Sequence, residues 1–265
     1  MAIYHINVKI IGRSSGRSSV AAAAYRAGEK LHNEHDGTTH NYDKKAGVIH
    51  AEIILPENAP SEFQNREILW NAVERIEKRK DSQTAREVEV ALPVEFELKE
   101  QLEVLRKYVQ ENFVDKGMCA DFAIHDKGDG NPHAHIMLTT REVTKEGFGG
   151  KNRDWNKLEH LEKWRESWAK VCNERLPEDK RIDHRTLEAQ GIDREPTIHI
   201  GVAAHNMEKR GILSDRGNIN REIKMGRQQR KTPIPKSKED LEEKIKAIKA
   251  REIVWEHDGH EHERE

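Results

Sequence analysis

Three histidines within a short segment, His125, His133 and His135, are the residues of this sequence best suited to chemistry. Imidazole binds several divalent metal ions, and a site with three protein ligands leaves coordination positions open for water or a substrate. The chain has 15 histidines, so a single His-x-His pair would be weak support for a metal site. A third histidine brought to the same place by local folding makes a metal site the favoured interpretation.

The residues around the triplet predict a β-hairpin that would bring the three side chains together. Residues 119–124 and 134–140 are rich in strand formers, and the segment DKGDGNP between them is rich in turn formers. Side chains alternate along a strand, so His133 and His135 share one face. In a symmetric hairpin His125 lies opposite His133, and opposite residues project to the same side. We therefore expect an open metal site, which is the catalytic rather than the structural arrangement.

The rest of the pattern predicts strands that alternate with helices. Period-two alternation indicates strands and a period near 3.6 indicates helices. Besides the hairpin, the expected strands cover residues 2–10, 48–55 and 85–92, and the expected helices cover residues 18–30, 61–79, 97–114 and 157–175. Polar residues 31–45 are expected to form a loop. The predicted fold class is α+β, with a mainly antiparallel central sheet packed by helices.

Composition restricts the class of protein further. Charged and hydrophobic residues each make up 35% of the chain, and periodic apolar segments predict a genuine core. We find neither an apolar run of membrane-spanning length nor a signal peptide, so a cytoplasmic protein without membrane insertion is expected. Cys119 and Cys172 are the only cysteines, which predicts two buried thiols and no disulfide framework.

The net charge of −2 conceals a basic segment near the C-terminus. Residues 205–236 contain nine Lys or Arg against three acids, an excess of about six positive charges. Such a stripe is the electrostatic footprint expected for nucleic acid, although a solvated charged helix has the same composition. The pattern changes near residue 201, so we expect a basic helical C-terminal extension, residues 201–265, after a main domain at residues 1–200.

Two stretches together resemble the MobA/MobL relaxases of mobilisable and conjugative plasmids, which belong to the wider HUH endonuclease group. They are IYHINVKIIGRSSGRSSVAAAAYRAG near the start and HDKGDGNPHAHIMLTTR around the triplet. The His-hydrophobic-His motif of that group corresponds to His133, Ala134 and His135. The likeness spans about residues 1–200, and IDHRTLEAQGIDREPTIHIG resembles a further family segment. The resemblance implies an HUH relaxase-like catalytic domain.

In this family a tyrosine near the N-terminus attacks a DNA phosphodiester, and the matching position is Tyr25. It follows a Gly/Ser/Arg loop that can cap a helix and offer N–H groups to an anion. Tyr4 alternates with apolar residues on an expected strand, and Tyr108 lies beside the apolar stripe of an expected helix. Tyr42 lies in an expected loop and is the fallback nucleophile. Without the motif, Tyr25 would be interpreted as an ordinary packing aromatic.

The resemblance also implies the activity, the cofactor and the partners. The activity is nicking of one DNA strand at a plasmid transfer origin by transesterification, through a 5′-phosphotyrosyl intermediate that can be religated. Three histidines alone would suit Zn, Mn, Co or Ni, whereas the family implies Mn²⁺ or Mg²⁺. The implied partners are single-stranded DNA and a hairpin at the origin, accessory relaxosome proteins and a type IV secretion coupling protein. The implied location is the bacterial cytoplasm, with transfer of the protein alongside DNA to a recipient cell.

Several charged residues are candidates for supporting roles. Glu87 and Glu89 lie off the apolar face of their strand, and either could orient a metal-bound histidine, with Glu89 preferred. A solvated strand face is the alternative explanation for both. Arg141 has the strand parity of His133 and His135 and is expected to project toward the substrate phosphate. The other predicted DNA-binding residues are Arg13, Arg17 and Arg26 around Tyr25, and Lys224, Arg227, Arg230 and Lys231 in the basic segment.

Three other functions fit parts of the pattern. A rolling-circle replication initiator uses similar chemistry, but its nucleophile usually follows the histidine motif, whereas Tyr25 precedes it. A metal-dependent DNA nuclease would hydrolyse DNA with water and leave no covalent adduct. A non-catalytic DNA-binding module could hold a structural metal at the same histidines.

Overall fold

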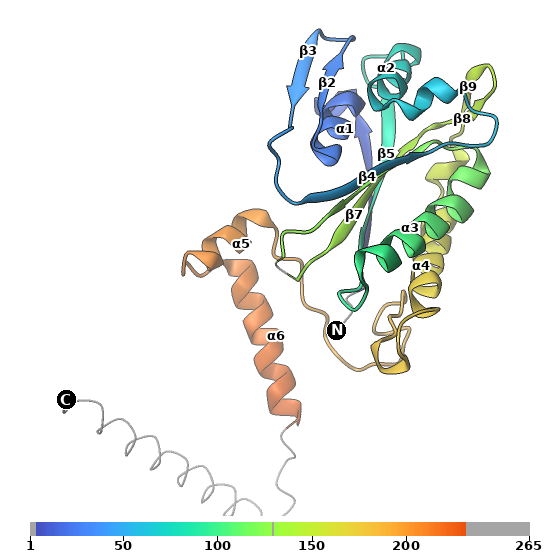
Figure 1. Cartoon of the computed structure of the whole chain (residues 1–265). Coiled ribbons are helices and arrows are strands. Elements are labelled where there is room, and N and C mark those ends of the chain that lie inside the picture. Colours follow the sequence, from blue (N-terminus) through green and yellow to red (C-terminus); the bar gives the residue numbers. More distant parts are fainter. Residues whose placement is uncertain (1–3, 129, 232–265) are drawn as a thin grey trace, which may run out of the picture. The chain divides into compact units, whose positions relative to one another are not determined.

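The computed structural model describes residues 4–128 and 130–231, and the chain divides into two compact units after Arg185. The first unit is built on a central sheet whose strand order is β1-β5-β7-β6-β4, with every neighbouring pair antiparallel (Figure 1). These strands are β1 (Ile6–Gly12), β4 (Val48–Ile54), β5 (Gln83–Ala91), β6 (Ala120–His125) and β7 (His133–Thr139). The predicted α+β class with an antiparallel central sheet is confirmed.

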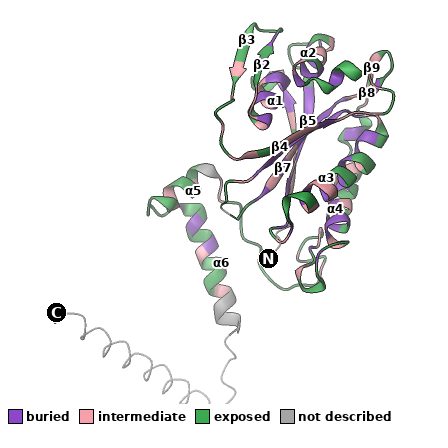
Figure 2. Ribbon diagram, in the orientation of Figure 1, coloured by how far each residue is buried: buried purple, intermediate pink, exposed green. Residues whose placement is uncertain are grey.

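Helices cover both faces of the sheet (Figure 1). One face packs against α1 (Ser19–Ala27) and α2 (Arg66–Ile76), and the other packs against α3 (Leu98–Asn112) and α4 (Leu158–Asn173). Because strand side chains alternate, the sheet serves two cores. Figure 2 shows the buried residues gathered between these layers. The short 3₁₀ segments of this unit are η1 (Arg13–Ser15), η2 (Ser61–Gln64), η3 (Val114–Lys116), η4 (Asp154–Asn156) and η5 (Glu178–Lys180).

Side-chain caps explain where two of the helices begin. The Ser18 hydroxyl accepts a hydrogen bond from the backbone N–H of Ala21 and so caps α1. The helix ends at Gly28, whose φ of 69° is the left-handed conformation that glycine adopts without steric cost. The helix predicted at residues 61–79 is split, because Asn65 adopts an extended conformation and caps α2 with its own side chain.

Two small hairpins were not predicted. The segment at residues 31–45, expected to be a loop, forms β2 (Lys30–Asn33) and β3 (Thr38–Asn41). The two strands expose most of their side chains, so they lack the apolar alternation that marks a half-buried strand. The other hairpin is β8 (Arg141–Thr144) with β9 (Gly147–Lys151), whose three glycines give it little strand-like sequence pattern.

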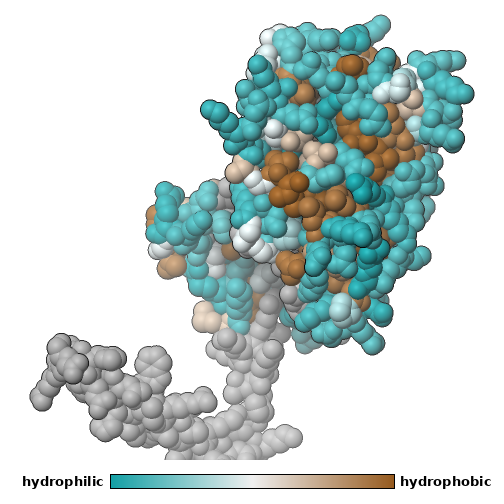
Figure 3. Space-filling model, in the orientation of Figure 1, coloured by the Kyte–Doolittle hydropathy of each residue, from teal (hydrophilic) through white to brown (hydrophobic). Residues whose placement is uncertain are grey.

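Most of the apolar residues expected in the helix stripes are buried, but Ile68 and Leu98 near the helix starts are exposed. Trp164 and Trp168 of α4 lie in the core on the α3/α4 side, where the Trp168 ring meets Tyr108 edge-on at 5.0 Å. Cys119 and Cys172 are buried free thiols, and burial raises the pKa of Cys119 to about 12. Most of the surface visible in Figure 3 is hydrophilic, as the high charged fraction requires.

A buried ion pair ties α2 to the sheet. Arg66 at the start of α2 donates to both carboxylate oxygens of Asp121 on β6, with a shortest N–O distance of 2.8 Å. The indole Nε1–H of Trp70 donates to the same carboxylate at 2.8 Å. Removing one partner would leave an uncompensated buried charge, which is among the most destabilising changes in a protein.

Replacing Arg66 with methionine is therefore expected to lower the free energy of unfolding by about 3 kcal/mol. The measurement is urea unfolding followed by circular dichroism. Arg75→Met is the matched control, because Arg75 lies on the same helix but pairs with Glu34 at the surface, with both side chains more than half exposed. An exposed pair contributes about 0–1 kcal/mol. Equal losses in the two variants would contradict this account of the pair.

The second unit, Thr186–Glu265, contains α5 (Val202–Lys209) and α6 (Asp215–Lys231) among its described residues. The sequence placed the domain boundary at residue 200, but the chain divides after Arg185. The reason is that Ile198 exchanges backbone–side-chain hydrogen bonds with Asn220 of α6, so the preceding segment belongs with this helix. The Lys/Glu-rich part of the predicted extension, residues 238–254, lies outside the described residues. None of the described helices is both long and apolar enough to cross a membrane.

Candidate metal centre and nucleophile

The three histidines converge on the sheet face that packs against α1 and α2. His125 on β6 is paired with His133 on β7, as the hairpin predicted, and His135 follows on the same face. The ring centroids are 5.5 Å apart for His125 and His133, 4.7 Å for His125 and His135, and 5.1 Å for His133 and His135. One nitrogen of each ring lies within 4.8 Å of the others, a separation at which one ion could contact all three.

Hydrogen bonds fix the orientation of two of the imidazole rings. His135 Nδ1 lies 2.7 Å from Glu87 Oε1, and His133 Nδ1 lies 2.9 Å from the carbonyl oxygen of Asn131. Both acceptors require a donor, so Nδ1 carries a proton, and Nε2 is the nitrogen that a neutral ring would offer to a metal. Fixing the tautomer of a ligating histidine in this way is the usual role of its outer partner.

His125 is hydrogen-bonded to the backbone of α1. Its Nε2 lies 2.7 Å from the carbonyl oxygen of Arg26 at the end of α1, so this nitrogen donates and Nδ1 is left with a lone pair. Burial, reinforced by repulsion from Lys45 and the other two histidines, lowers the pKa of His125 to about 4. The ring is therefore neutral at neutral pH, which is the form that binds metal ions. The donor set fits a divalent ion.

Glu87, rather than the preferred Glu89, is the carboxylate that orients the cluster. Glu89 is the direct cross-strand partner of His135, yet its side chain turns to Lys9 on β1 at 2.9 Å. Glu87 is buried and accepts a hydrogen bond from His135 Nδ1. It also accepts two hydrogen bonds from the Arg26 guanidinium, with N–O distances of 2.6 and 2.7 Å. Burial opposes ionisation of Glu87, but these hydrogen bonds outweigh it and hold its pKa well below the usual range.

Glu87, Glu89 and His135 form a second group with metal-ligand spacing. Its two carboxylates are already neutralised by Arg26 and by Lys9. The three-histidine cluster keeps free lone pairs, so it is the better candidate for a metal.

Tyr25 lies at the end of α1, directly before the residue that contacts His125 and Glu87. Its side chain is 47% exposed and its ring meets that of Tyr42 edge-on at 5.2 Å. The ammonium of Lys45 lies 3.8 Å from the centroid of the Tyr25 ring and 3.3 Å from His125 Nε2, and it donates to the Tyr25 carbonyl oxygen at 2.7 Å. Because Nε2 of His125 already donates to Arg26, Lys45 approaches this nitrogen without a hydrogen bond, and the lysine lies between the tyrosine and the histidine cluster.

Lys45 was missed by the sequence analysis. Burial, with repulsion from Arg26 and Lys127, lowers its pKa to about 8. Lys45 precedes β4, whose first residue, Val48, is paired with His125. This pairing is the only signal that could have placed Lys45 near the cluster, and it requires the strand order to be known.

Two arginines predicted to contact DNA are engaged elsewhere. Arg13 pairs with Glu74 at 2.7 Å and also donates to two backbone carbonyls after α2. Arg141 donates to Glu77 at 2.9 Å and to the Gly149 carbonyl, because β7 ends at Thr139 and the strand parity does not extend to Arg141. The structure therefore does not bring either side chain to the histidine cluster.

The other predicted basic residues have different settings. Arg26 is at the site, but its guanidinium is committed to Glu87, so it serves as a structural link. Arg17 is exposed before α1. Lys224 is exposed on α6 of the second unit, and Arg227, Arg230 and Lys231 belong to the same helix.

The fold and this cluster define a relaxase-like α+β domain. The profile of the MobA/MobL family matches residues 17–210. The chain belongs to the MobA/MobL family, as its two motifs indicated.

Curated relatives and a solved structure are similar over most of the chain. The chain is 38% identical to a probable mobilization protein MobA of Bifidobacterium longum, over 84% of this chain and 47% of that protein. It is 36% identical to a conjugal transfer protein TraA of Agrobacterium fabrum, over 79% of this chain and 22% of that protein. A solved chain, from work on the molecular basis of vancomycin resistance transfer in Staphylococcus aureus, matches with a TM-score of 0.62 and 32% identity, over 72% of this chain and 96% of that one. The chain thus spans less than half the length of these two curated relatives.

Proposed function

We propose that the first unit is the catalytic domain of a relaxase that nicks one DNA strand at a plasmid transfer origin, with Tyr25 as the nucleophile. The observation that supports this proposal is that the exposed Tyr25 directly precedes Arg26, whose carbonyl oxygen contacts one of three clustered histidines. The family supports it, because relatives of this chain are named mobilization and conjugal transfer proteins.

The proposed reaction is a transesterification. The Tyr25 phenolic oxygen bonds to the scissile phosphorus as the bond from phosphorus to the 3′ oxygen breaks, so the leaving strand ends in a 3′-OH. The phenolic proton is lost and one proton is gained by the leaving oxygen, so the reaction has no net proton change. The phosphodiester is conserved in the 5′-phosphotyrosyl link, and the reverse attack by a 3′-OH reseals the strand.

Lys45 would assist the attack without being the nucleophile. A phenol with a pKa near 10 needs help to carry negative charge at neutral pH. A cation over the ring face stabilises that charge and restricts the ring, and its bond to the Tyr25 carbonyl fixes the end of α1.

A divalent ion at His125, His133 and His135, Mn²⁺ or Mg²⁺ by family, would supply positive charge to orient the scissile phosphate and offset charge developing there. The chain's own contribution is to place one nitrogen of each imidazole within 4.8 Å of the other two. Exposed Arg17 and the basic helix α6 are the proposed contacts to the DNA backbone, so binding should weaken steeply with salt.

The competing functions can be separated by whether they cleave DNA and whether they form a covalent protein–DNA adduct. A metal-dependent nuclease would cleave DNA and leave no covalent adduct, and a binding module would leave the DNA intact. A rolling-circle initiator would also form an adduct, and it is disfavoured by the mobilization relatives. The test is incubation of the full chain with a single-stranded transfer-origin oligonucleotide and Mn²⁺, followed by mass mapping of the adduct. A DNA-linked peptide containing Tyr25 supports the proposal, and cleavage without any adduct would sink it.

The orienting carboxylate gives a quantitative prediction for the metal. Glu87→Gln is expected to weaken Mn²⁺ binding by about 10- to 100-fold, because a neutral amide replaces the charged acceptor that fixes the tautomer of His135. Isothermal titration calorimetry on the intact protein measures this change. Glu89→Gln is the control, since Glu89 binds Lys9, and its metal affinity should stay within about threefold of the wild type. A larger loss in Glu89→Gln than in Glu87→Gln would reverse the assignment.

A further inference from the structure

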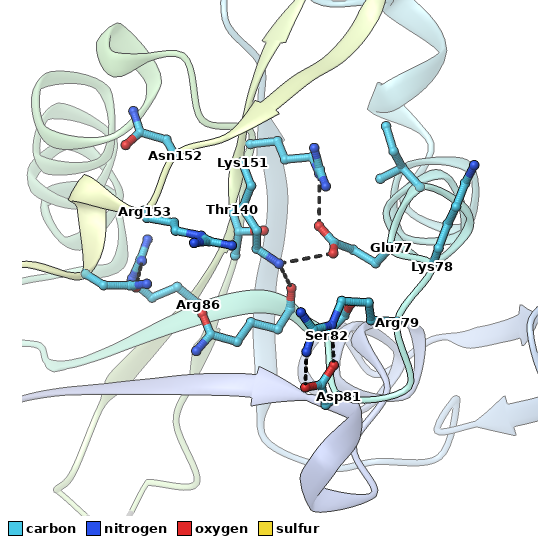
Figure 4. A pocket seen from close by; sticks show the side chains of 14 residues that line it. Glu77, Lys78, Arg79, Asp81, Ser82, Arg86, Thr140, Lys151, Asn152 and Arg153 are labelled. Carbon is cyan, nitrogen blue, oxygen red and sulfur yellow. Dashed lines mark hydrogen bonds and ion pairs between the residues drawn. The ribbon is translucent and has the colours of Figure 1, made fainter.

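A cavity of about 580 Å³ lies at the end of β5 and β7 remote from the histidines. Its volume is within the range of about 300–1,000 Å³ typical of small-molecule sites. Arg86 on β5 is paired with Leu138, whereas the His133 end of β7 is paired with Ala91, five residues further along β5. At about 3.3 Å per residue the His133 end is roughly 17 Å from Arg86 along the strand, and His135, paired with Glu89 three residues away, is roughly 10 Å from it. The cavity lining is shown in Figure 4 and comes from the α2–β5 connection, from β5 and from the segments around β8 and β9.

Arg86 is the unusual residue of this cavity. It is only 2% exposed, and its Nη1 has no hydrogen-bond partner among the described residues. Its Nη2 donates to Asn156, a neutral acceptor, and its guanidinium carbon lies 5.6 Å from the centre of the Trp164 ring. Burial alone lowers the pKa of Arg86, to about 10, so the side chain is still cationic at neutral pH.

A buried cation without a counter-charge is costly. The described residues provide no carboxylate that pairs with Arg86. Arg66, Arg13 and Arg26 are the other well-buried guanidinium groups discussed above, and each one has an acidic partner. Arg86 therefore differs from the other three arginines, and a bound anion would supply the counter-charge that it lacks.

The lining as a whole is cationic. It contains six basic and two acidic side chains, an excess of four positive charges: Lys78, Arg79, Arg86, Arg141, Lys151 and Arg153 against Glu77 and Asp81. Glu77 is shared by Arg141 and Lys151, and Asp81 is taken by Arg79. Burial opposes ionisation of Glu77, but the two cations outweigh it and lower its pKa. Among the described residues, Lys78, Arg86 and Arg153 are left without a carboxylate.

Phosphate is the anion that this donor set fits best. A guanidinium presents N–H groups in a fork that matches two oxygens of a phosphate. The neutral lining residues Thr140, Asn152 and Asn156 add donors for the remaining oxygens. Several donors around one cavity suit a tetrahedral anion with more acceptor oxygens than a carboxylate has.

We propose that this cavity is a second phosphate-binding site, anchored by Arg86 and separate from the Tyr25 centre. The phosphate belongs either to a free phosphorylated small molecule or to the backbone of a bound DNA strand. The site is independent of the proposed nicking reaction, because Arg86 lies on the sheet face opposite the histidines.

The first arm of the test titrates the full-length protein with inorganic pyrophosphate at low ionic strength in EDTA, which excludes binding through a metal at the histidines. Saturable binding is expected, and Arg86→Gln should weaken it by about 10- to 100-fold. Arg79→Gln is the matched control, because Arg79 lines the same cavity but is exposed and paired with Asp81. Arg86→Lys keeps the charge and serves as the second variant if Arg86→Gln does not fold.

The second arm titrates a short single-stranded oligonucleotide under the same conditions. A free-ligand site shows pyrophosphate binding that depends on Arg86 and oligonucleotide binding that does not. A DNA-backbone site shows oligonucleotide binding that depends on Arg86 and is displaced by pyrophosphate. The proposal is overturned if neither titration changes in both Arg86 variants, or if Arg79→Gln has as large an effect. Tyr25→Phe should change neither arm, so failure of the nicking proposal is seen separately.

Discussion

Tyr25→Phe is expected to abolish the covalent protein–DNA adduct and to lower the nicking rate by about 10⁴-fold or more. The substitution removes only the phenolic oxygen, which is the atom that would bond to phosphorus. The ring keeps its contacts with Lys45 and Tyr42, because both are made to the ring face or edge. DNA affinity should therefore stay within about twofold of the wild type, since the loss is confined to the transition state.

The measurement pairs single-turnover nicking of a labelled single-stranded oligonucleotide with a filter-binding assay on the same preparation. Tyr42→Phe is the matched control, because Tyr42 lies against Tyr25 but is half-buried and is only the fallback nucleophile. Retained adduct in Tyr25→Phe together with its loss in Tyr42→Phe would move the nucleophile to Tyr42. Retained cleavage without an adduct in both variants would favour a hydrolytic nuclease.

The histidine hairpin could be predicted because its determinants are local. Turn residues between two strand-forming runs set the register, and period-two alternation then assigns each histidine to a face. The pairing of His125 with His133 is the predicted one. The helices on either side of the sheet were predictable for the same reason, since each carries its own apolar stripe.

The supporting residues could not be predicted because they depend on long-range geometry. Glu87 and Glu89 have identical parity, and only the position of Lys9 on a neighbouring strand and of Arg26 on α1 separates their roles. Lys45 meets the cluster because β4 is the neighbour of β6 in the sheet. Parity also failed for Arg141, where the strand ends before the residue it was meant to place.

Arg26 links Tyr25, the proposed nucleophile, to the histidine cluster proposed to hold the metal. Its guanidinium donates hydrogen bonds to Glu87, which in turn accepts one from His135. The carbonyl oxygen of Arg26 accepts a hydrogen bond from His125. Tyr25 is the preceding residue of the same helix. A shift of the end of α1 would therefore disturb both halves of the proposed site together, and this coupling is the physical reason to treat them as one centre.

The double substitution His133→Ala and His135→Ala is expected to remove bound metal and to lower nicking by about 10³-fold or more. Two of three imidazole ligands are lost, while the opposite face of β7 keeps its buried Ala134 and Ile136, so the hairpin should still fold. Metal content of the purified protein, by inductively coupled plasma mass spectrometry after Mn²⁺ loading and desalting, is the direct readout. His50→Ala is the control, because His50 lies on the other face of the sheet and pairs with Glu52. Metal content that is undiminished in the double variant would refute the three-histidine site, whatever happens to the nicking rate.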